Sequence, residues 1–174
     1  MRRFYLAIVV AGIALSPGCA VTDRAPAVAL DAKARWVLLP IANHTDQPQA
    51  GLRAEAILEG VLRSRGVGDL RIYPAEFGTE TTLDGGPRKP LPEAVKWAKE
   101  QGFRYAVFGA VDEWRYKVGV DGEPAVGIAL QAIDLERDAV VWSAVGAKSG
   151  WSREALSGVA QKLIRNLLDG ARLK

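Results

Sequence analysis

Few side chains in this chain could support catalysis. It has one histidine, His44, and one cysteine, Cys19. A serine hydrolase would need His44 as its base, but serines and aspartates are too common for such a triad to be specific. No nucleophile elbow, phosphate-binding loop, HExxH or CxxC motif is present. We therefore expect no catalytic site, cofactor or metal, and a hydrolase that uses His44 is the alternative.

Two pairs of acidic residues lie close together in the sequence. Asp112 and Glu113 are neighbours in a segment that alternates like a strand, so they should point to opposite faces of a sheet. Asp121 and Glu123 lie in an Asp-Gly turn and should be solvated. Neither pair is expected to form a catalytic dyad.

Cys19 follows a stretch that is typical of an export signal. Arg2 and Arg3 give the chain a positive start, and an apolar run at residues 6–15 follows. This run is too short to span a bilayer as a helix, and it fits the central region of a secretory signal peptide. We expect residues 1–18 to be this signal peptide.

The residues before Cys19 resemble the lipobox of bacterial lipoproteins. Such a signal is cut before a cysteine that carries a diacylglycerol and then an N-acyl chain, such as palmitate. Ser16 stands where leucine is usual, and Pro17 is uncommon. Two or more acyl chains anchor a protein stably, and Ala20 in place of Asp favours the outer membrane. The alternative is a plain signal peptide with an incidental cysteine.

The chain after the signal has the size of one domain. Its 156 residues can bury a core of their own. The whole chain carries +3, and removing the two arginines of the signal leaves about +1. No basic block suggests nucleic acid as a partner. Residues 19–33 show no period and predict a lipidated tether, and residues 34–174 predict a single domain.

The hydrophobic pattern of this domain alternates between strands and helices. The first half predicts a buried strand at 34–43, a helix from Leu52 to Gly66, a strand at 70–74, an exposed loop at 75–90 and a helix from Pro90 or Pro92 to Gly102. The second half predicts strands at 104–119, 125–135 and 139–149, and a helix from Ser152, its N-cap, to about Asp169. The order βαβαβββα predicts an α+β fold in which one mixed sheet packs with three helices.

Five tryptophans are candidates for the core or for contacts. Trp36 and Trp142 lie in apolar strands and are expected in the core. Trp97 lies off the inward face of its helix and is a candidate contact. Trp114, next to Tyr116 on one predicted strand face, is a candidate for either the core or a subunit interface.

Trp151 differs from the other tryptophans because it lies in a polar loop. Lys148 and Arg153 are close to it in the sequence. An aromatic ring flanked by cations suits a membrane interface, where the ring lies among headgroups and the cations meet phosphate. We expect these three residues to contact a membrane, and the alternative is that Trp151 folds back onto the domain.

Three distinctive motifs lie in the second half of the chain. They are Glu-Trp-Arg-Tyr-Lys at 113–117, Asp-Gly-Glu-Pro-Ala-Val-Gly at 121–127 and Gly-Ala-Lys-Ser-Gly-Trp-Ser-Arg at 146–153. With these motifs, residues 35–168 resemble the PelC family of Pel polysaccharide export lipoproteins. Pro-x-x-Asn at 40–43 and Val-Val-Trp-Ser at 140–143 are broader marks. They resemble a superfamily of outer-membrane assembly lipoproteins with a TolB-amino-terminal-like domain.

The resemblance implies a subunit of an assembly that is not an enzyme. It implies a closed ring of about a dozen copies on the periplasmic face of the outer membrane. The ring would lie under the β-barrel exporter PelB and help to funnel a cationic exopolysaccharide of biofilms into it. The alternative is a monomeric outer-membrane lipoprotein that binds and activates a periplasmic cell-envelope enzyme.

The resemblance also implies roles for the residues singled out above. Trp151, with Lys148 and Arg153, would contact the membrane. Trp97, Trp114 and Tyr116 are available for the subunit interface. The acidic residues that would attract the polymer are Asp112, Glu113, Asp121 and Glu123.

Overall fold

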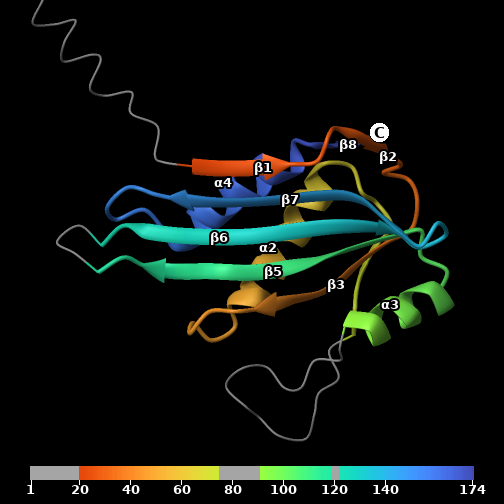
Figure 1. The fold of residues 1–174 in the computed structure, drawn as a ribbon, viewed down its shortest axis with the longest axis horizontal. Helices are drawn as coiled ribbons and strands as arrows, with labels where there is room; N and C mark the ends of the chain where they lie inside the picture. Colours follow the sequence, from red (N-terminus) through yellow and green to blue (C-terminus); the bar gives the residue numbers. More distant parts are fainter. Residues whose placement is uncertain (1–19, 75–90, 119–121) are drawn as a thin grey trace, which may run out of the picture.

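A mixed sheet of six strands runs through the centre of the protein (Figure 1). The computed structural model describes residues 20–74, 91–118 and 122–174. The signal peptide, Cys19, the loop at 75–90 and Asp121 therefore lie outside the described residues. The elements are β1 (Ala20–Arg24), β2 (Val28–Leu30), β3 (Trp36–Asn43), α2 (Ala50–Ser64), β4 (Leu70–Ile72), α3 (Leu91–Glu100), β5 (Tyr105–Tyr116), β6 (Pro124–Asp134), β7 (Ala139–Ser149), α4 (Leu156–Leu168) and β8 (Ala171–Leu173).

The strand order of the main sheet is β1-β7-β6-β5-β3-β4. β3 is parallel to β4 and β5, because a helix-containing crossover joins each pair, whereas β5, β6 and β7 form the expected antiparallel meander. β2 and β8 form a separate two-stranded parallel pair. The predicted α+β class, with one mixed sheet and three helices, is confirmed, and the small second sheet is an addition to it.

The helices divide the core into two clusters of different size. α2 and α4 lie behind the sheet in Figure 1 and cover one whole face, where Trp36 and Trp142 are buried as expected. α3 covers only one end of the opposite face, over Val37, Leu39 and Ala106. Within the described residues, no other helix lies over this second face.

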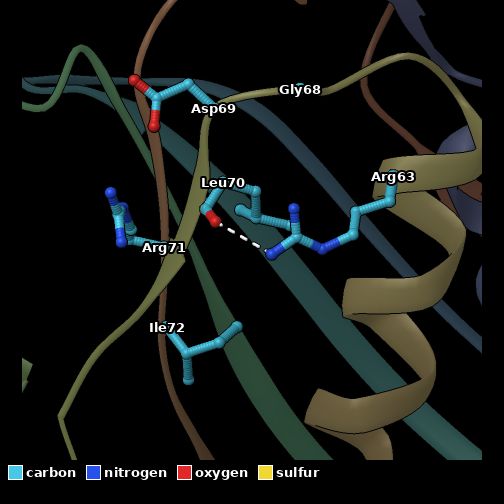
Figure 2. A pocket seen from close by; sticks show the side chains of 6 residues that line it. All are labelled: Arg63, Gly68, Asp69, Leu70, Arg71 and Ile72. Atoms are coloured by element: carbon cyan, nitrogen blue, oxygen red, sulfur yellow. Dashed lines mark hydrogen bonds between the residues drawn. The ribbon is translucent and has the colours of Figure 1, made fainter.

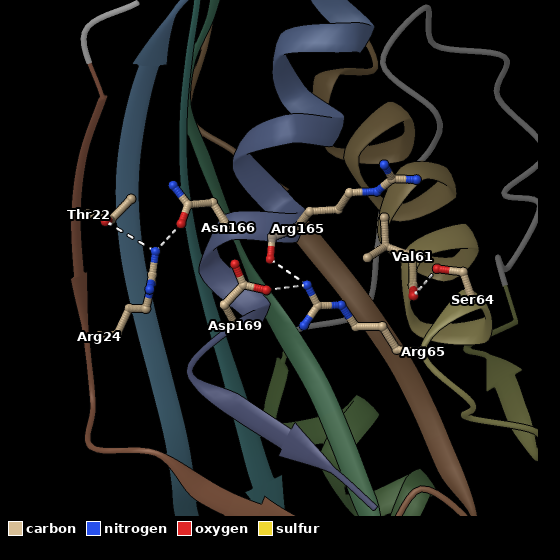
Figure 3. Close-up of polar contacts among 8 residues, drawn as sticks. All are labelled: Thr22, Arg24, Val61, Ser64, Arg65, Arg165, Asn166 and Asp169. Atoms are coloured by element: carbon tan, nitrogen blue, oxygen red, sulfur yellow. Dashed lines mark hydrogen bonds and ion pairs between the residues drawn. The ribbon is translucent and has the colours of Figure 1, made fainter. Parts of the chain in front are cut away.

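The segment that was expected to be a tether is part of the fold. β1 runs antiparallel to β7, and β2 pairs with β8. Arg24 ties β1 to α4, because its guanidinium donates to Asn166 Oδ1 (Figure 3). The sequence did not reveal these strands because they are short and polar, and their partners lie more than a hundred residues away.

Two further expectations about local structure were wrong. α4 begins at Leu156, and its N-cap is Ala155 rather than Ser152. Between them the chain makes a turn in which Arg153 has a φ of 69°. In β5 the pairing register shifts between Val111 and Glu113. This bulge interrupts the predicted alternation, so Asp112 does not share a face with the buried Trp114.

Candidate functional site

One end of the main sheet brings together the start of β1 and the loop that follows β7 (Figure 1). Ala20, the first residue of β1, pairs with Lys148 near the end of β7. The hairpin between β5 and β6 ends beside them, because Gly150 N–H donates to Pro124 O (2.8 Å). Cys19 directly precedes Ala20 in the sequence, and the strand that would follow a lipid on Cys19 begins at the end of the sheet that holds the Trp151 loop.

The Trp151 loop, residues 150–155, has a defined backbone and an exposed ring. Trp151 is 61% exposed, so its ring does not fold back into the core. The backbone N–H of Trp151 donates to Glu154 Oε2 (3.2 Å), and the backbone carbonyl of Trp151 accepts from Glu154 N–H (3.0 Å). A Cβ at Gly150 would lie 2.5 Å from Val159 Cγ2, 2.6 Å from Glu154 Oε2 and 2.9 Å from Pro124 Cγ, so the space favours glycine at this position.

Glu154 fixes the loop to the domain. It forms an ion pair with Lys162, which lies in the middle of α4. The hydrogen bond from Lys162 lowers the pKa of Glu154; partial burial opposes this, and the Trp151 N–H adds to the lowering. Glu154 therefore stays ionised at neutral pH and holds Trp151 in its exposed position.

Tyr116 supports the same loop from β5. Its hydroxyl accepts from Leu156 N–H (3.2 Å) and donates to Glu154 O (3.3 Å). It thereby satisfies one of the free N–H groups at the start of α4, where Ala155 offers no side-chain cap. Tyr116 was a candidate for the subunit interface. In the structure its hydroxyl is bonded within the chain, and its ring is half exposed at the same end of the sheet as the Trp151 loop.

Cationic and apolar residues lie at the same end of the sheet as the Trp151 loop. Lys148 is half-buried at the end of β7, and Arg153 is exposed in the loop. Lys117 donates to Ser149 Oγ (2.7 Å), and Val118 beside it is fully exposed. Sequence reasoning missed Lys117 and Val118, although an apolar residue next to a lysine at a hairpin tip was a usable signal.

The other two tryptophan candidates serve the interior. Trp114 is 2% exposed and belongs to the larger core cluster, so the core alternative holds and its ring is not available to a partner. Trp97 is half-buried; its ring lies edge-on to Tyr73, with centroids 5.0 Å apart, and 5.7 Å from Phe103. It anchors α3 to the smaller cluster.

Among the acidic candidates that the structure describes, Asp112 and Glu123 are exposed and Glu113 is half-buried. Asp112 Oδ1 lies 2.8 Å from His44 Nδ1, and Glu113 forms an ion pair with Arg115 (3.0 Å). Glu123 is exposed at the base of the hairpin. His44 and Asp112 are both more than half exposed, unlike the enclosed pocket in which a hydrolase excludes water.

The described residues offer neither a metal site nor a membrane span. Within 20–74, 91–118 and 122–174, no three histidine, aspartate or glutamate side chains are grouped to hold an ion. In the same ranges, every helix is too short or too polar to cross a bilayer.

Solved structures relate the chain to known proteins, although no protein-family model and no curated protein matches it. Two structures of the PelC dodecamer from Paraburkholderia phytofirmans, one of them a point variant, are each 40% identical to it, with a TM-score of 0.76. Each match covers 90% of this chain, and it covers 100% and 99% of the respective PelC chains.

More distant similarities show a shared fold alone. Lipoprotein GNA1162 from Neisseria meningitidis is 17% identical, with a TM-score of 0.55, over 78% of this chain and 96% of that one. The hypothetical protein CT253 from Chlamydia trachomatis is 11% identical, with a TM-score of 0.53, over 79% and 94%. Because the PelC match combines 40% identity with nearly complete coverage, the chain belongs to the PelC family.

Proposed function

We propose that this protein forms a ring on the periplasmic face of the outer membrane and helps to pass a cationic exopolysaccharide to the β-barrel exporter PelB. The observation that carries the proposal is the match to PelC chains that assemble as dodecamers. Family membership makes the protein an oligomeric, envelope-associated lipoprotein of the Pel export type. The ring's place at the outer membrane, its cargo and its exporter are the parts that we propose.

The end of the sheet that holds Trp151 is the membrane-facing end in this proposal. Acyl chains on Cys19 would enter the bilayer directly before β1, whose first residue pairs with Lys148. Trp151 would lie among the headgroups, and Lys148, Arg153 and Lys117 would meet lipid phosphates. A lipid anchor and an aromatic contact at one end would fix the orientation of each subunit, which a lipid on a free tether would not.

The acidic residues would attract the cationic polymer. Glu113 forms an ion pair with Arg115, so its field is partly compensated, and Asp112 contacts the His44 ring. Glu123 is exposed at the hairpin base, and it is in none of the ion pairs found among the described residues. Asp121 is the fourth candidate by its charge in the sequence.

The first test is the mass of the assembly and its effect on secretion. We expect the mature chain carrying Cys19→Ser to have, by light scattering, a mass many times that of the monomer. Cells whose protein carries the same substitution should secrete less polymer, because the ring would lose its lipid anchor. A strict monomer at high concentration would contradict the ring and favour an activator of a cell-envelope enzyme.

A further inference from the structure

β4, residues 70–72, forms one edge of the main sheet. It runs parallel to β3, and both of its neighbours in the chain are bonded to that strand: Trp36 N–H donates to Asp69 O (2.8 Å), and Tyr73 N–H donates to Leu38 O (2.9 Å). The backbone groups of successive residues in a strand point to opposite sides. Counting from Asp69 in steps of two therefore gives the residues that face β3, and the residues between them face outwards.

The outward-facing residues of β4 are Leu70 and Ile72. Leu70 O accepts from Arg63 Nη2 (3.0 Å), so its carbonyl is indeed turned away from β3 (Figure 2). The N–H groups of Leu70 and Ile72 and the carbonyl of Ile72 have no hydrogen-bond partner within residues 20–74, 91–118 and 122–174. In this part of the chain, two donors and one acceptor of the edge are therefore available to another strand.

A hollow of about 470 Å³ lies along this edge, beside α2 (Figure 2). The residues that line it are Arg63, Gly68, Asp69, Leu70, Arg71 and Ile72. Leu70 is buried, whereas Ile72 is 39% exposed. An added strand would find space in this hollow, and it would place a side chain next to Ile72, where cross-strand pairs of apolar residues stabilise a sheet.

The charges around this edge favour a negatively charged occupant. Figure 2 shows Arg63 reaching to the strand from α2, and Arg71 on the other side of the strand. Arg63 pairs with Glu59 (2.9 Å), and Arg35 pairs with Asp69 (3.5 Å), whereas the exposed Arg71 is in none of the ion pairs found among the described residues. Three arginines beside two carboxylates leave the edge positive. It would repel a cationic polymer and attract an acidic segment.

We propose that β4 is a docking edge for a different protein, which adds an extended segment to the sheet as a further strand. The segment alternates apolar and acidic side chains. An apolar side chain lies beside Ile72 and an acidic one beside Arg71, because successive residues of β4 point to opposite faces of the sheet. Backbone bonds to Leu70 and Ile72 hold the segment, and the arginines select its charge. This inference goes beyond the ring and its cargo and depends on neither.

The opposite edge of the sheet, β1, does not offer the same combination. β1 carries Asp23, and the guanidinium of its one arginine, Arg24, donates to Asn166 Oδ1 and to Thr22 Oγ1 (3.4 Å). An acidic segment would meet a like charge there and an arginine that is already bonded. β4 is therefore the edge that fits such a segment.

The first experiment measures the binding of two synthetic peptides to the mature chain carrying Cys19→Ser. One peptide alternates valine with glutamate, the other alternates valine with lysine, and both have blocked ends and a fluorescent label. Fluorescence anisotropy gives the affinities. Because the edge offers few backbone groups, we expect the glutamate peptide to bind weakly, with a Kd between about 10 μM and 1 mM, and the lysine peptide to bind at least about tenfold more weakly still.

Two pairs of variants test the backbone and the charge separately. Ile72→Pro removes an outward N–H and spares the bonds to β3, because proline is accepted on an edge strand. It should weaken binding of the glutamate peptide at least about tenfold, whereas Ile72→Val, which keeps the N–H, should change it less than about twofold.

Arg71→Glu should remove the preference for the glutamate peptide. Arg172→Glu is the matched control, because Arg172 is also an exposed arginine in the middle of a three-residue strand, β8, and its substitution should leave the preference unchanged. If Ile72→Pro lowers the melting temperature, the comparison of these two arginine variants decides.

Hydrogen exchange locates the bound peptide. Slower exchange at residues 68–73 in the presence of the glutamate peptide supports the proposal, and protection of residues 20–24 instead would assign β1 and overturn it. Equal binding of the two peptides, or no binding of the glutamate peptide at about 1 mM, overturns it as well. So does a fall in the assembly mass of Ile72→Pro at an unchanged melting temperature, because β4 would then be a contact between copies. The mass of the Cys19→Ser reference protein tests the ring independently of all these outcomes.

Discussion

The two ends of the sheet use the same chemical device for different purposes. At the end of β6, Asp134 is 1% exposed and accepts from Arg104 Nη2 (3.1 Å) and from the backbone N–H groups of Glu136 and Arg137. At the other end, Glu154 accepts from Lys162 and from Trp151 N–H. Each carboxylate fixes a turn by pairing with cationic side chains and accepting from the backbone: Asp134 pairs with Arg104 and Arg137, and Glu154 pairs with Lys162. Asp134 closes the turn into the core, whereas Glu154 holds its turn so that Trp151 stays exposed.

We therefore expect Asp134 to stabilise the whole fold and Glu154 to fix the position of the Trp151 loop. A buried carboxylate leaves several donors unsatisfied when it is removed, so its loss is felt by the whole fold. A partly exposed carboxylate is easily replaced by water, so its loss should affect the local loop. The substitutions below test this division, beginning with the largest expected effect.

Asp134→Ala should destabilise the protein by about 3 kcal/mol. It removes the acceptor of two backbone N–H groups and one of the two carboxylate partners of Arg104, which keeps its ion pair with Glu136. Urea unfolding followed by circular dichroism measures the loss. Glu123→Ala, at an exposed position, is the control and should be nearly neutral. A loss below about 0.5 kcal/mol for Asp134→Ala would show that this end of the sheet is no more constrained than the surface.

Trp151→Ala should weaken membrane binding about tenfold while the melting temperature stays unchanged. An aromatic side chain leaving an apolar phase loses roughly 1.5 kcal/mol or more, which corresponds to this factor. Sedimentation of the Cys19→Ser protein with vesicles containing phosphatidylglycerol measures the partitioning.

Trp97→Ala provides the opposite control for this measurement. Trp97 packs against Tyr73 and Phe103 inside the smaller cluster. Its loss should lower the melting temperature and leave the vesicle binding of the folded protein unchanged. If Trp151→Ala instead lowers the melting temperature and spares binding, Trp151 stabilises the domain and the membrane-facing end is misassigned.

Much of this architecture was predictable because the signals are local. Apolar residues alternate in the strands between residues 104 and 149 and recur every three to four residues in the helices. These periods predict the α+β class and the three helices directly. β1 and β2 were not predictable, because their stability comes from β7 and β8 at the far end of the chain. The bulge at Asp112 was also hidden, since one extra residue leaves no mark in composition.

The candidate site was predictable in its centre and not in its surroundings. An exposed aromatic between cations marked Trp151, because such a residue is unusual in a polar loop. Lys117, Val118 and Tyr116 are 33 or more residues away in sequence and join the site only when β5 pairs with β6. The sequence left Trp114 open between the core and an interface, because its burial depends on α2 and α4, which no pattern within one strand reveals.

Acidification should remove the contribution of Asp134 with a defined sign. Burial alone would raise the pKa of Asp134, but the hydrogen bonds from Arg104, Arg137 and Glu136 together lower it. The unfolded pKa is about 3.9, so the ionised group stabilises the fold above that pH and loses its effect as pH falls through the lower folded value.

The free-energy difference between the wild type and Asp134→Asn tests this dependence. We expect it to be constant from about pH 5 to pH 8 and to shrink below about pH 4. Urea titrations at intervals of pH give the difference. A value that stays constant down to about pH 2.5 would contradict the assignment of the stabilisation to the ionised carboxylate.

Glu154→Ala should have the smallest effect on stability and a clear local one. Its pair with Lys162 is mostly exposed on the lysine side, so the global loss should be about 0.5 kcal/mol. The Trp151 N–H loses its acceptor, and one hydrogen bond of about 1 kcal/mol corresponds to roughly fivefold faster amide exchange. Hydrogen exchange of peptides that cover residues 150–156 measures this, with those of the Asp134 turn as the internal reference. Faster exchange in both regions would mean that Glu154 stabilises the whole fold, and the division between the two ends would no longer hold.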